Sequence, residues 1–574
     1  MSFNSPFKNI FTLHRLKNIF LVFLMMTLAA CGLLYEYIFS HYASRVLGSI
    51  ETVVYSIIGI MVVSMGVGTL FALKFKRVHT TLSILESVIA ILAISGVFII
   101  SGLNGFVYYL PEIISETYNL SYEIGMKDSA FSLLQAISRY AIYFMAFVMG
   151  CLVGMEIPLV ARIRGELNNS EDINDDTGFM YGVDYIGAGI GAFIWVNFLL
   201  QMEVSKSMFY IATTNIVIGF LFLIIFKDKI KYFKSLMSLQ IITFTMMILL
   251  VGQIDDWQEY LEDSLYHNEK IYSANTSKQR IALTEEIDPY TNKKKYNFFI
   301  NGRTQFVEND EYIYHGLLVY PAMNIAKKTD EILLIGGGDG IALKDILKHN
   351  PKKVTMIDLD KEIIDFFTMP YYQDGIQINK RLLELNENSF LDPRLELKIG
   401  DAYLMAYDLF LKERKFDAVI IDLPDPSHPD LNKMYSRGFY KLIYNLLNDD
   451  GALVTQSASP YNSKNAFLSI KKAMENAYFE KADQYHAHIP SFGEWGWTIA
   501  LKNNKSPVDE IAKIEQFKIP HDWLEPDLLK STFHFGKKYY DNYDEIKINT
   551  EGNGVTYTYY KQAYEDFNGY TQHN

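Results

Sequence analysis

Apolar residues fill about seven stretches of the chain before residue 255, each about 20 residues long. A bilayer core of about 30 Å requires helices of this length, whereas the buried helices of soluble proteins rarely recur at full spanning length. Repeated glycines within the stretches also suit close helix packing in lipid. The pattern therefore predicts an α-helical membrane bundle over residues 1–254. The expected spans are residues 19–40, 52–73, 82–104, 135–160, 179–201, 207–226 and 236–254.

After residue 254 the pattern changes to alternating apolar and polar positions separated by turn residues. We expect a short acidic helix over Asp255–Glu262. A hairpin signal, Asn301-Gly302, then joins the last two strands of a small β-strand unit over residues 255–320. The strands of this unit are expected at Ile281–Glu286, Tyr296–Ile300 and Thr304–Val307.

A third pattern begins with the apolar strand Glu331–Ile335. The segment Gly336-Gly337-Gly338-Asp339-Gly340 and the helix Ile341–Lys348 follow it directly. A strand, a glycine loop and a helix start form the dinucleotide-type fingerprint, in which glycines let the backbone approach a ligand. We therefore expect an α/β Rossmann-like (methyltransferase-type) parallel-sheet domain over residues 321–574. Its extension from Asp527 onward is expected to be a solvated packing layer without a separate site.

Acidic residues follow the ends of the next predicted strands. Asp358 ends the second strand about 20 residues beyond the glycine loop, where an acid can bind ribose hydroxyls. Asp401 follows a third strand, and Asp422 and Asp425 follow a fourth. Helix N-caps would explain one or two such acids but not the whole series. The acids are therefore expected to converge on the crevice in which open α/β sheets bind ligands.

Composition and charge separate the same two halves. The mean hydropathy of +0.04 averages a lipid-facing half and a water-facing half. Residues 1–252 hold 16 basic and 16 acidic side chains, so the remaining 37 basic and 50 acidic side chains carry the whole net charge of −13. This acidity excludes a basic nucleic-acid binder and suits cationic ligands. The two cysteines, Cys31 and Cys151, lie in apolar runs, which excludes a disulfide scaffold and a cysteine-based zinc site, and no metal is expected.

Lys and Arg residues alternate between the expected connections and predict an orientation. One side has Lys8, Arg15, Lys17, Lys74, Lys76, Arg77, Arg162, Arg164, Lys227, Lys229, Lys231 and Lys234, and the other has only Arg45, Lys127 and Lys206. The positive-inside rule then places the N-terminus in the cytoplasm of a multi-pass protein of the cell membrane. Seven spans would put the C-terminal half outside, but a miscounted span would reverse this, so the side of this half stays open.

The first apolar run has a second interpretation. Leu28-Ala29-Ala30-Cys31 resembles the cleavage box of a lipoprotein signal peptide, and lipidation at Cys31 would leave six spans. The run continues past Cys31 through Ile38, which favours an uncleaved first helix.

Ionisable side chains within the expected spans are expensive to bury and are candidates for function. Glu36, Glu86, Glu156 and Asp184 fall within or at the edge of a span. Facing a shared interior, they would hold a cationic amine or relay protons. Alternatively they are interfacial, paired with Arg45 or Arg139, or protonated.

Taken together, the residues resemble the spermidine synthase (polyamine aminopropyltransferase) family. The resemblance runs from about Thr276 to Ala500 and extends to the membrane-fused, multi-pass branch of the family through segments of the N-terminal half. The matching pieces are Gln279, Asn301–Gln305, Asp310–His315, the Gly336–Gly340 loop, Asp358, Gly400–Ala402, Asp422–Pro426, Gln456, Gly493–Gly496, and in the first half Leu33–Glu36, Gly154–Pro158 and Asp184–Gly187.

The resemblance implies a reaction and a donor site. The co-substrate would be decarboxylated S-adenosylmethionine, with no tightly bound cofactor. Asp339 would pair with the donor's propylamine and repel the carboxylate of intact S-adenosylmethionine. The other donor contacts implied by the resemblance are Gln279, Gly336, Gly338, Asp358 at the ribose, Gly400, and Asp401 at the adenine.

The resemblance also implies an acceptor site. Asp422 would be the base that keeps the incoming amine unprotonated, with Tyr314 assisting and Asp425 holding the amine. The acceptor would be an amine such as putrescine, and the enzyme a homodimer at the lipid bilayer. Further residues expected in the acceptor cleft are Gln305, His315, Gln456 and Glu494.

Three departures from the family leave the acceptor open. Leu423-Pro424 stand where the family has Ser-Ser, Lys278 precedes Gln279 in place of Tyr, and Gly316 follows His315 in place of Glu. Two other functions therefore remain: an S-adenosylmethionine-type transferase acting on a lipid or peptide amine, and a polyamine transporter or sensor whose α/β domain only binds ligand.

Overall fold

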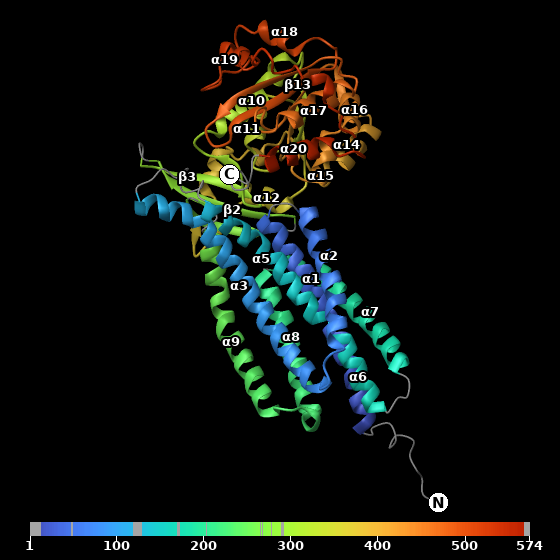
Figure 1. Ribbon diagram of the computed structural model, residues 1–574. Coiled ribbons are helices and arrows are strands. Elements are labelled where there is room, and N and C mark those ends of the chain that lie inside the picture. The colour runs from blue at the N-terminus through green and yellow to red at the C-terminus, as the bar shows by residue number, and fades with distance from the viewer. Residues whose placement is uncertain are drawn as a thin grey trace, which may run out of the picture. The chain divides into compact units, whose positions relative to one another are not determined.

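The computed structural model describes residues 13–47, 50–118, 129–168, 173–202, 204–263, 266, 268–276, 278–288 and 292–566. The chain divides into two compact units, residues 1–267 and 268–574, each with its own hydrophobic core. The first unit is helical and the second contains every described strand (Figure 1).

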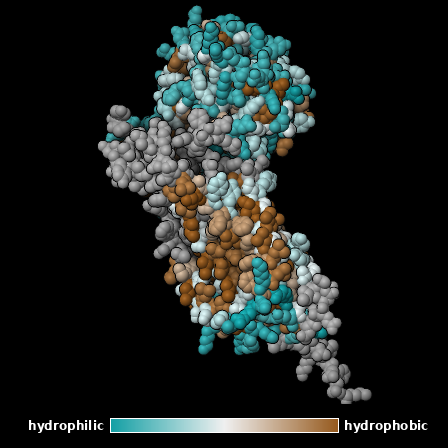
Figure 2. Space-filling model, in the orientation of Figure 1, coloured by the Kyte–Doolittle hydropathy of each residue, from teal (hydrophilic) through white to brown (hydrophobic). Residues whose placement is uncertain are grey.

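Long helices make up the first unit, as the apolar stretches predict. Within the described residues, six helices are long and apolar enough to cross a membrane, and the first six expected spans fall on them. The surface of this unit shows a broad hydrophobic band (Figure 2). The helices are α1 (Leu13–Leu47), α2 (Ile50–Ala72), α3 (Val78–Tyr118), α5 (Ser129–Gly154), α6 (Glu156–Asn168), α7 (Ile173–Asn197), α8 (Val204–Ile225) and α9 (Phe233–Asp263).

The end of the helical unit differs from the prediction. The expected short helix Asp255–Glu262 is not separate, because α9 runs without a break from Phe233 to Asp263. The change from apolar to acidic composition ends the apolar stretch of α9 at Leu249 without ending the helix. The seventh expected span therefore falls on a helix whose apolar stretch is shorter than the other six.

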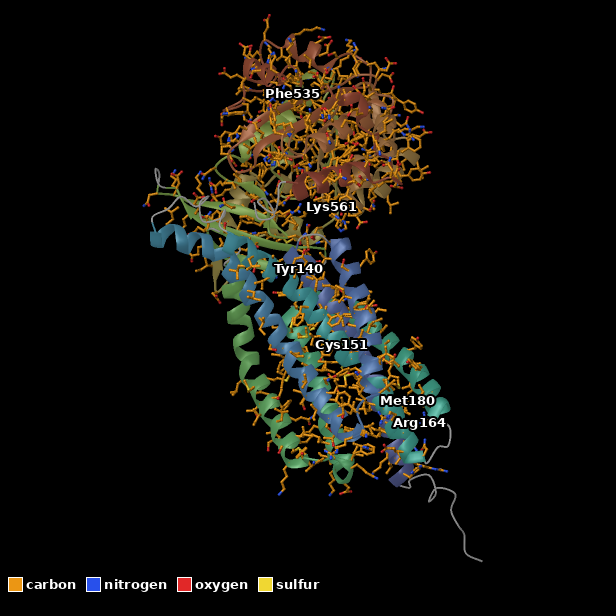
Figure 3. All side chains as sticks on the ribbon, viewed as in Figure 1. Tyr140, Cys151, Arg164, Met180, Phe535 and Lys561 are labelled. Atoms are coloured by element: carbon orange, nitrogen blue, oxygen red, sulfur yellow. The ribbon has the colours of Figure 1, made fainter. Side chains whose placement is uncertain are left out.

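Glycines bring neighbouring helices of this unit together. A Cβ atom at Gly154 of α5 would overlap the backbone of Met65 in α2, and one at Gly68 of α2 would overlap the backbone of Cys151 in α5. Small residues at such contacts let backbones approach closely, as expected for helices in lipid. At one end of the unit, where α6 packs against α7, Arg164 lies near Met180 (Figure 3).

The second unit is built on a seven-stranded sheet with the order β12-β13-β11-β10-β5-β6-β9. The five strands from β11 to β9 are parallel, which confirms the predicted Rossmann-like arrangement, and β12 and β13 add an antiparallel edge. The strands are β5 (Glu331–Gly336), β6 (Lys353–Asp358), β9 (Leu395–Ile399), β10 (Phe416–Asp422), β11 (Leu447–Gln456), β12 (Ala482–Ile489) and β13 (Gly493–Leu501).

Helices cover both faces of this sheet, so its central strands are apolar without alternation. Residues 332–335 of β5 and 418–421 of β10 are fully buried. The helices that matter for the site are α10 (Glu311–Ile325), α11 (Ile341–Lys348), α12 (Lys361–Phe366), α14 (Ala402–Leu411) and α20 (Val555–Asp566).

A smaller antiparallel sheet, β1-β2-β3-β4, precedes the large one. The three expected strands are confirmed as β2 (Arg280–Ile287), β3 (Lys294–Ile300) and β4 (Arg303–Val307), while β1 (Glu269–Asn275) lacks clear alternation and was not predicted. Phe298 and Phe306 of this sheet share a core with Ile341 and Phe367 of the α/β domain. The small sheet thus packs on the domain that carries the glycine loop.

Candidate active site

The register of the central strands brings the glycine loop and the predicted acids to one edge of the sheet. Gly336 at the end of β5 lies opposite Asp422 at the end of β10, and Asp358 ends β6 on the other side of β5. The Gly337 N–H donates to the Asp422 carbonyl over 3.2 Å. These strand-end residues therefore form one continuous edge, as the sequence predicts.

Backbone conformation and close contacts restrict the glycines of the loop. Gly336 and Gly337 have φ of +82° and +76°, which L-residues rarely adopt. A Cβ atom at Gly336 would overlap the Asp422 carbonyl oxygen, and one at Gly338 would lie 3.1 Å from Asp358 Oδ2. The loop backbone is thus held between two of the predicted acids.

Asp339 stands at the start of helix α11. Its Oδ1 accepts a hydrogen bond from the Ile341 N–H over 2.9 Å. Burial raises the pKa of Asp339, and the nearby His315 opposes this rise. A carboxylate in this setting is stabilised by a cationic partner, which agrees with its predicted pairing with a propylamine.

Tyr314 and Asp422 form the predicted pair. Helix α10 places the Tyr314 hydroxyl 2.8 Å from Asp422 Oδ1, to which it donates. Burial raises the pKa of Asp422 to about 6, with His315 opposing the rise and Asp339 adding to it. A carboxylate with a pKa near neutrality is a more effective proton acceptor than an ordinary aspartate.

His315 is a cation within this acidic edge rather than a neutral lining residue. Its Nδ1 lies 3.2 Å from Glu311 Oε2 and 2.9 Å from the Glu311 carbonyl. Burial alone would lower its pKa, but Glu311, Asp339 and Asp422 outweigh burial and raise the pKa to about 9. Glu311, which was not predicted, is one turn before His315 on α10 and also contacts Lys344 Nζ at 3.5 Å.

Asp425 has one oxygen fixed and one open. Its Oδ2 accepts a hydrogen bond from the Tyr560 hydroxyl over 2.9 Å, while its buried Oδ1 has no hydrogen-bond partner within the described residues. Burial raises the pKa of Asp425 to about 6, and the Tyr560 hydroxyl, Arg303 and the Gln456 side chain oppose the rise. The C-terminal extension, expected as a packing layer, thus also brings the Tyr560 hydroxyl of helix α20 to a predicted site residue.

The predicted nucleoside contacts surround the end of β6. Burial raises the pKa of Asp358 to about 6, and its Oδ1 accepts from the Asp360 N–H over 2.9 Å. The Gly400 N–H donates to the Asp358 carbonyl over 2.8 Å. The loop that ends at Gln279 is tied to the same place, because the Thr276 hydroxyl donates to Asp360 Oδ2 over 2.6 Å.

Asp401 caps helix α14 and has a partner that was not predicted. Its Oδ1 accepts from the Leu404 N–H over 3.1 Å, and its Oδ2 lies 2.6 Å from Lys433 Nζ. Burial would raise the pKa of Asp401, but Lys433 and the backbone donor hold it below its ordinary value. Asp401 is thus ionised at neutral pH.

Three residues predicted in the acceptor cleft have other partners. Gln305 Nε2 lies within 3.4 Å of the Arg303 and Thr304 carbonyls of its own strand. Gln456 Nε2 donates to the Leu423 carbonyl over 2.6 Å and supports the loop that carries Asp425. Glu494 lies 2.9 Å from His486 Nδ1 and 3.7 Å from His488 Nδ1, across the β12–β13 pair.

The departures from the family have local explanations. The Tyr435 hydroxyl donates to the Pro424 carbonyl over 2.7 Å, which anchors the Leu423-Pro424 segment. A Cβ atom at Gly316 would lie 2.7 Å from His521 Nε2, so His521 occupies the space of a side chain there. Lys278 is exposed and its charge is solvated.

The chain is similar to known proteins. Residues 311–512 match the spermine/spermidine synthase domain family. The polyamine aminopropyltransferase of Shewanella oneidensis is 39% identical over 552 residues, which cover 96% of each chain. The polyamine aminopropyltransferase 1 of Streptomyces coelicolor is 30% identical over 493 residues and 84% of each chain. A crystal structure of spermidine synthase in complex with the transition state analogue AdoDATO aligns with a TM-score of 0.42 and 23% identity over 48% of this chain and 89% of that chain.

Proposed function

Because the chain belongs to the polyamine aminopropyltransferase family of enzymes, we propose that it transfers the aminopropyl group of decarboxylated S-adenosylmethionine to putrescine or a similar diamine. The products are spermidine, or the corresponding polyamine, and methylthioadenosine. The observation that carries this proposal is the Tyr314–Asp422 hydrogen bond beside the glycine loop, with the open Oδ1 of Asp425 three residues further along the same loop.

The reaction forms one bond and breaks one. The amine nitrogen attacks the aminopropyl carbon next to the sulfonium, the new C–N bond forms, and the C–S bond breaks with its electron pair leaving on sulfur. The sulfonium is a good leaving group, so the enzyme supplies no general acid. Asp422 takes the proton that the attacking nitrogen loses, while Tyr314 keeps this carboxylate oriented through its hydroxyl.

Three of the acids at the strand ends each bind a different part of the donor. Asp339 accepts the propylammonium of the decarboxylated donor and repels the extra carboxylate of intact S-adenosylmethionine. Asp358, with the glycine loop against its Oδ2, contacts the ribose. Asp401 contacts the adenine from its position at the start of α14. His315, as a cation among these acids, limits the repulsion between Asp339 and Asp422 before the cationic donor arrives.

Asp425 binds the acceptor amine in this proposal. Tyr560 occupies Oδ2, so the open Oδ1 faces an incoming ammonium group as a hydrogen-bond acceptor. A diamine then places one nitrogen at Asp422 for reaction and the other at Asp425 for binding. Gln456 holds the carbonyl of Leu423, and its side chain also opposes the raised pKa of Asp425.

We also propose that the helical unit crosses the cell membrane several times, with the N-terminus in the cytoplasm. The support is the length and apolar composition of its six candidate spans, the hydrophobic band on its surface (Figure 2) and the alternating distribution of Lys and Arg. A reporter fused after residue 574 tests the side of the catalytic unit. The family relationship further leads us to propose a homodimer, which light scattering of the purified protein tests.

The donor test uses purified full-length protein with putrescine. We expect methylthioadenosine to form from decarboxylated S-adenosylmethionine and not from the intact donor. Replacing Asp339 by Asn should reduce this preference, since the repulsive charge is lost. Methyl transfer from intact S-adenosylmethionine, with no methylthioadenosine from the decarboxylated donor, would contradict the proposed function.

A further inference from the structure

A second group of polar side chains lies inside the apolar core of the helical unit. Glu86 of α3, Glu156 of α6, Asn215 of α8 and Gln240 of α9 are each at most 2% exposed, and Tyr35 of α1 is 1% exposed. They come from five helices, and the proposed transfer reaction uses none of them.

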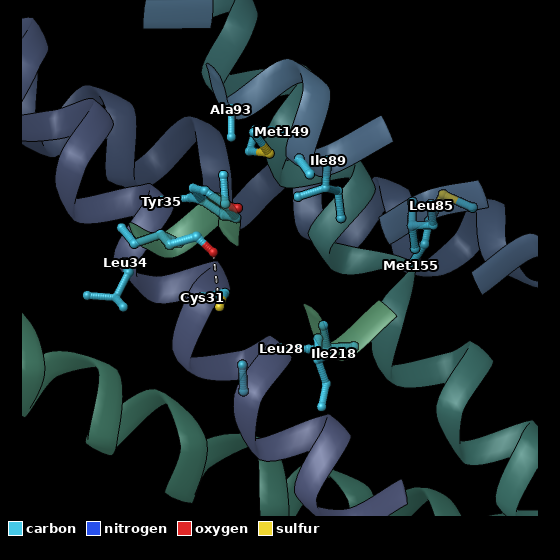
Figure 4. Close-up of a cluster of buried hydrophobic side chains, with 14 of the residues drawn as sticks. Leu28, Cys31, Leu34, Tyr35, Leu85, Ile89, Ala93, Met149, Met155 and Ile218 are labelled. Carbon is cyan, nitrogen blue, oxygen red and sulfur yellow. Dashed lines mark hydrogen bonds between the residues drawn. The ribbon is translucent and has the colours of Figure 1, made fainter. Parts of the chain in front are cut away.

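Apolar side chains surround this group. Tyr35 lies near Ala93 of α3 and Met149 of α5 (Figure 4). Leu85 and Met155, which directly precede the two glutamates, are buried in the same apolar cluster (Figure 4). The polar group is thus enclosed by hydrocarbon.

Direct contacts bring three of the five residues together. The Asn215 Nδ2 donates to Glu86 Oε2 over 2.7 Å. One turn further along α8, a Cβ atom at Gly219 would lie 3.0 Å from Gln240 Nε2 and 3.1 Å from Glu86 Cβ. The absence of a side chain at Gly219 therefore lets α3 and α9 bring Glu86 and Gln240 to the same place on α8.

Glu156 and Tyr35 lie on helices that pack against the same part of the bundle. Helix α6 packs against α1 and α3, and Tyr35 and Met155, the neighbour of Glu156, belong to one apolar cluster (Figure 4). Helix α3 packs against α6, α8 and α9, which places Glu86 at the meeting point of these helices.

A helix break positions Glu156. Helix α5 ends at Gly154 and α6 begins at Glu156, two residues before Pro158. Pro158 has no N–H, so it cannot donate to the Gly154 carbonyl. The Thr69 hydroxyl of α2 lies 2.9 Å from that carbonyl and 3.0 Å from the Met65 carbonyl, and its hydrogen is shared between them. The break is therefore compensated by a neighbouring helix, as in membrane proteins whose interrupted helices carry binding sites.

Several atoms of the group lack partners. Within the described residues, no hydrogen bond is made by Glu86 Oε1, Asn215 Oδ1, either amide atom of Gln240, or the Tyr35 hydroxyl. Buried polar atoms are normally hydrogen-bonded and buried charges are normally paired, so this arrangement favours a ligand.

We propose that this group is a binding site for the protonated primary amine of an alkylamine. An ammonium group brings one positive charge and three N–H donors, which match the carboxylate of Glu86 and the open oxygens of Glu86, Asn215 and Gln240. A metal ion fits less well, because no three His, Cys, Asp or Glu residues within the described residues gather closely enough to hold one. This site is additional to the acceptor site at Asp425 and has no part in the transfer step.

Equilibrium dialysis of radiolabelled putrescine against the full-length protein in detergent tests the site. Glu86→Gln removes the charge and keeps an oxygen that accepts from Asn215. We expect this variant to bind one putrescine fewer per chain than the unmodified protein, with affinity at the lost site reduced about tenfold or more. Methylthioadenosine release should stay within about twofold, because the variant leaves the strand-end site intact.

Glu166→Gln is the matched control. Glu166 lies on the same helix as Glu156, but its side chain is 54% exposed and contacts His79 at 3.7 Å, so its replacement should leave the number of bound amines unchanged. Glu156→Gln serves as a second variant if Glu86→Gln does not fold, as judged by thermal unfolding. Equal putrescine binding in all variants would overturn the proposed site. Displacement of the labelled putrescine by sodium ions to the same extent as by unlabelled putrescine would overturn it as well. If transfer itself were absent, the loss of one bound amine in Glu86→Gln would still be measurable.

Discussion

The chain contains two clusters of carboxylates that differ in what surrounds them. At the strand ends of the α/β unit, each acid has a partner within the protein: Tyr314 at Asp422, Tyr560 at Asp425 and Lys433 at Asp401. In the helical unit, Asn215 is the described hydrogen-bond donor to Glu86. A partnered group is prepared for chemistry before substrate arrives, whereas an unpartnered one depends on a cation from outside.

The strand-end group should respond most strongly to loss of its central acid. We expect Asp422→Asn to lower kcat by about 10²- to 10⁴-fold, the usual contribution of a general base, because the amide cannot accept the amine proton. Release of methylthioadenosine from decarboxylated S-adenosylmethionine and putrescine measures this loss. Asp449→Asn is the control, since Asp449 is fully exposed. If Asp422→Asn keeps more than about a tenth of the kcat of the unmodified protein, Asp422 is not the base.

Activity should also depend on pH in a way that an ordinary aspartate would not produce. Asp422 must be ionised to accept a proton, and burial raises its pKa to about 6. As the pH falls below 6, kcat/KM should bend downward and fall by at least about tenfold per pH unit, because Asp358 and Asp425, whose pKa values are also about 6, are protonated over the same range. An unperturbed aspartate would shift this bend to about pH 4. A profile that keeps one slope from pH 8 to pH 4.5 would show that Asp422 is not the titrating base.

A smaller effect is expected at the edge of the strand-end group. Tyr560→Phe removes the hydroxyl that fixes Asp425 Oδ2. One lost hydrogen bond to a charged group predicts a KM for putrescine raised about threefold to tenfold, with kcat nearly unchanged. Tyr559→Phe on the same helix is the control, because the Tyr559 hydroxyl contacts the backbone of Lys547 instead. If both variants behave alike, α20 has only a structural role.

The smallest effect is expected at Glu494. Its carboxylate contacts His486 and His488 rather than a residue of the reacting group. Glu494→Gln should therefore change kcat and the KM for putrescine by less than about twofold. A tenfold rise of the KM for putrescine in Glu494→Gln would show that Glu494 belongs to the acceptor cleft. The strand-end group would then include a residue of β13.

Local patterns in the sequence were sufficient to predict the strand-end acids. A buried strand followed directly by Asp, as at Asp358 and Asp422, specifies both the element and the edge at which the side chain lies. The fold class follows from the same patterns. Apolar stretches of spanning length, and strands followed by glycine loops, can each be recognised from a segment of about 20 residues.

Long-range partners could not be predicted in this way. Tyr560 follows Asp425 by 135 residues and Lys433 follows Asp401 by 32, and no spacing rule connects them. The role expected for Glu494 came from the likeness of a short turn, but the register of β12 with β13 places two histidines beside it. The pairing of side chains across a fold depends on tertiary packing, which a single sequence does not show.

The transfer reaction itself is tested most directly by product stoichiometry. Full-length protein is incubated with putrescine and with decarboxylated S-adenosylmethionine labelled in the aminopropyl group, and both products are quantified by mass spectrometry. The proposed mechanism predicts labelled spermidine and methylthioadenosine in equal amounts, because each C–N bond formed accompanies one C–S bond broken. Methylthioadenosine without labelled spermidine, or neither product, would contradict it.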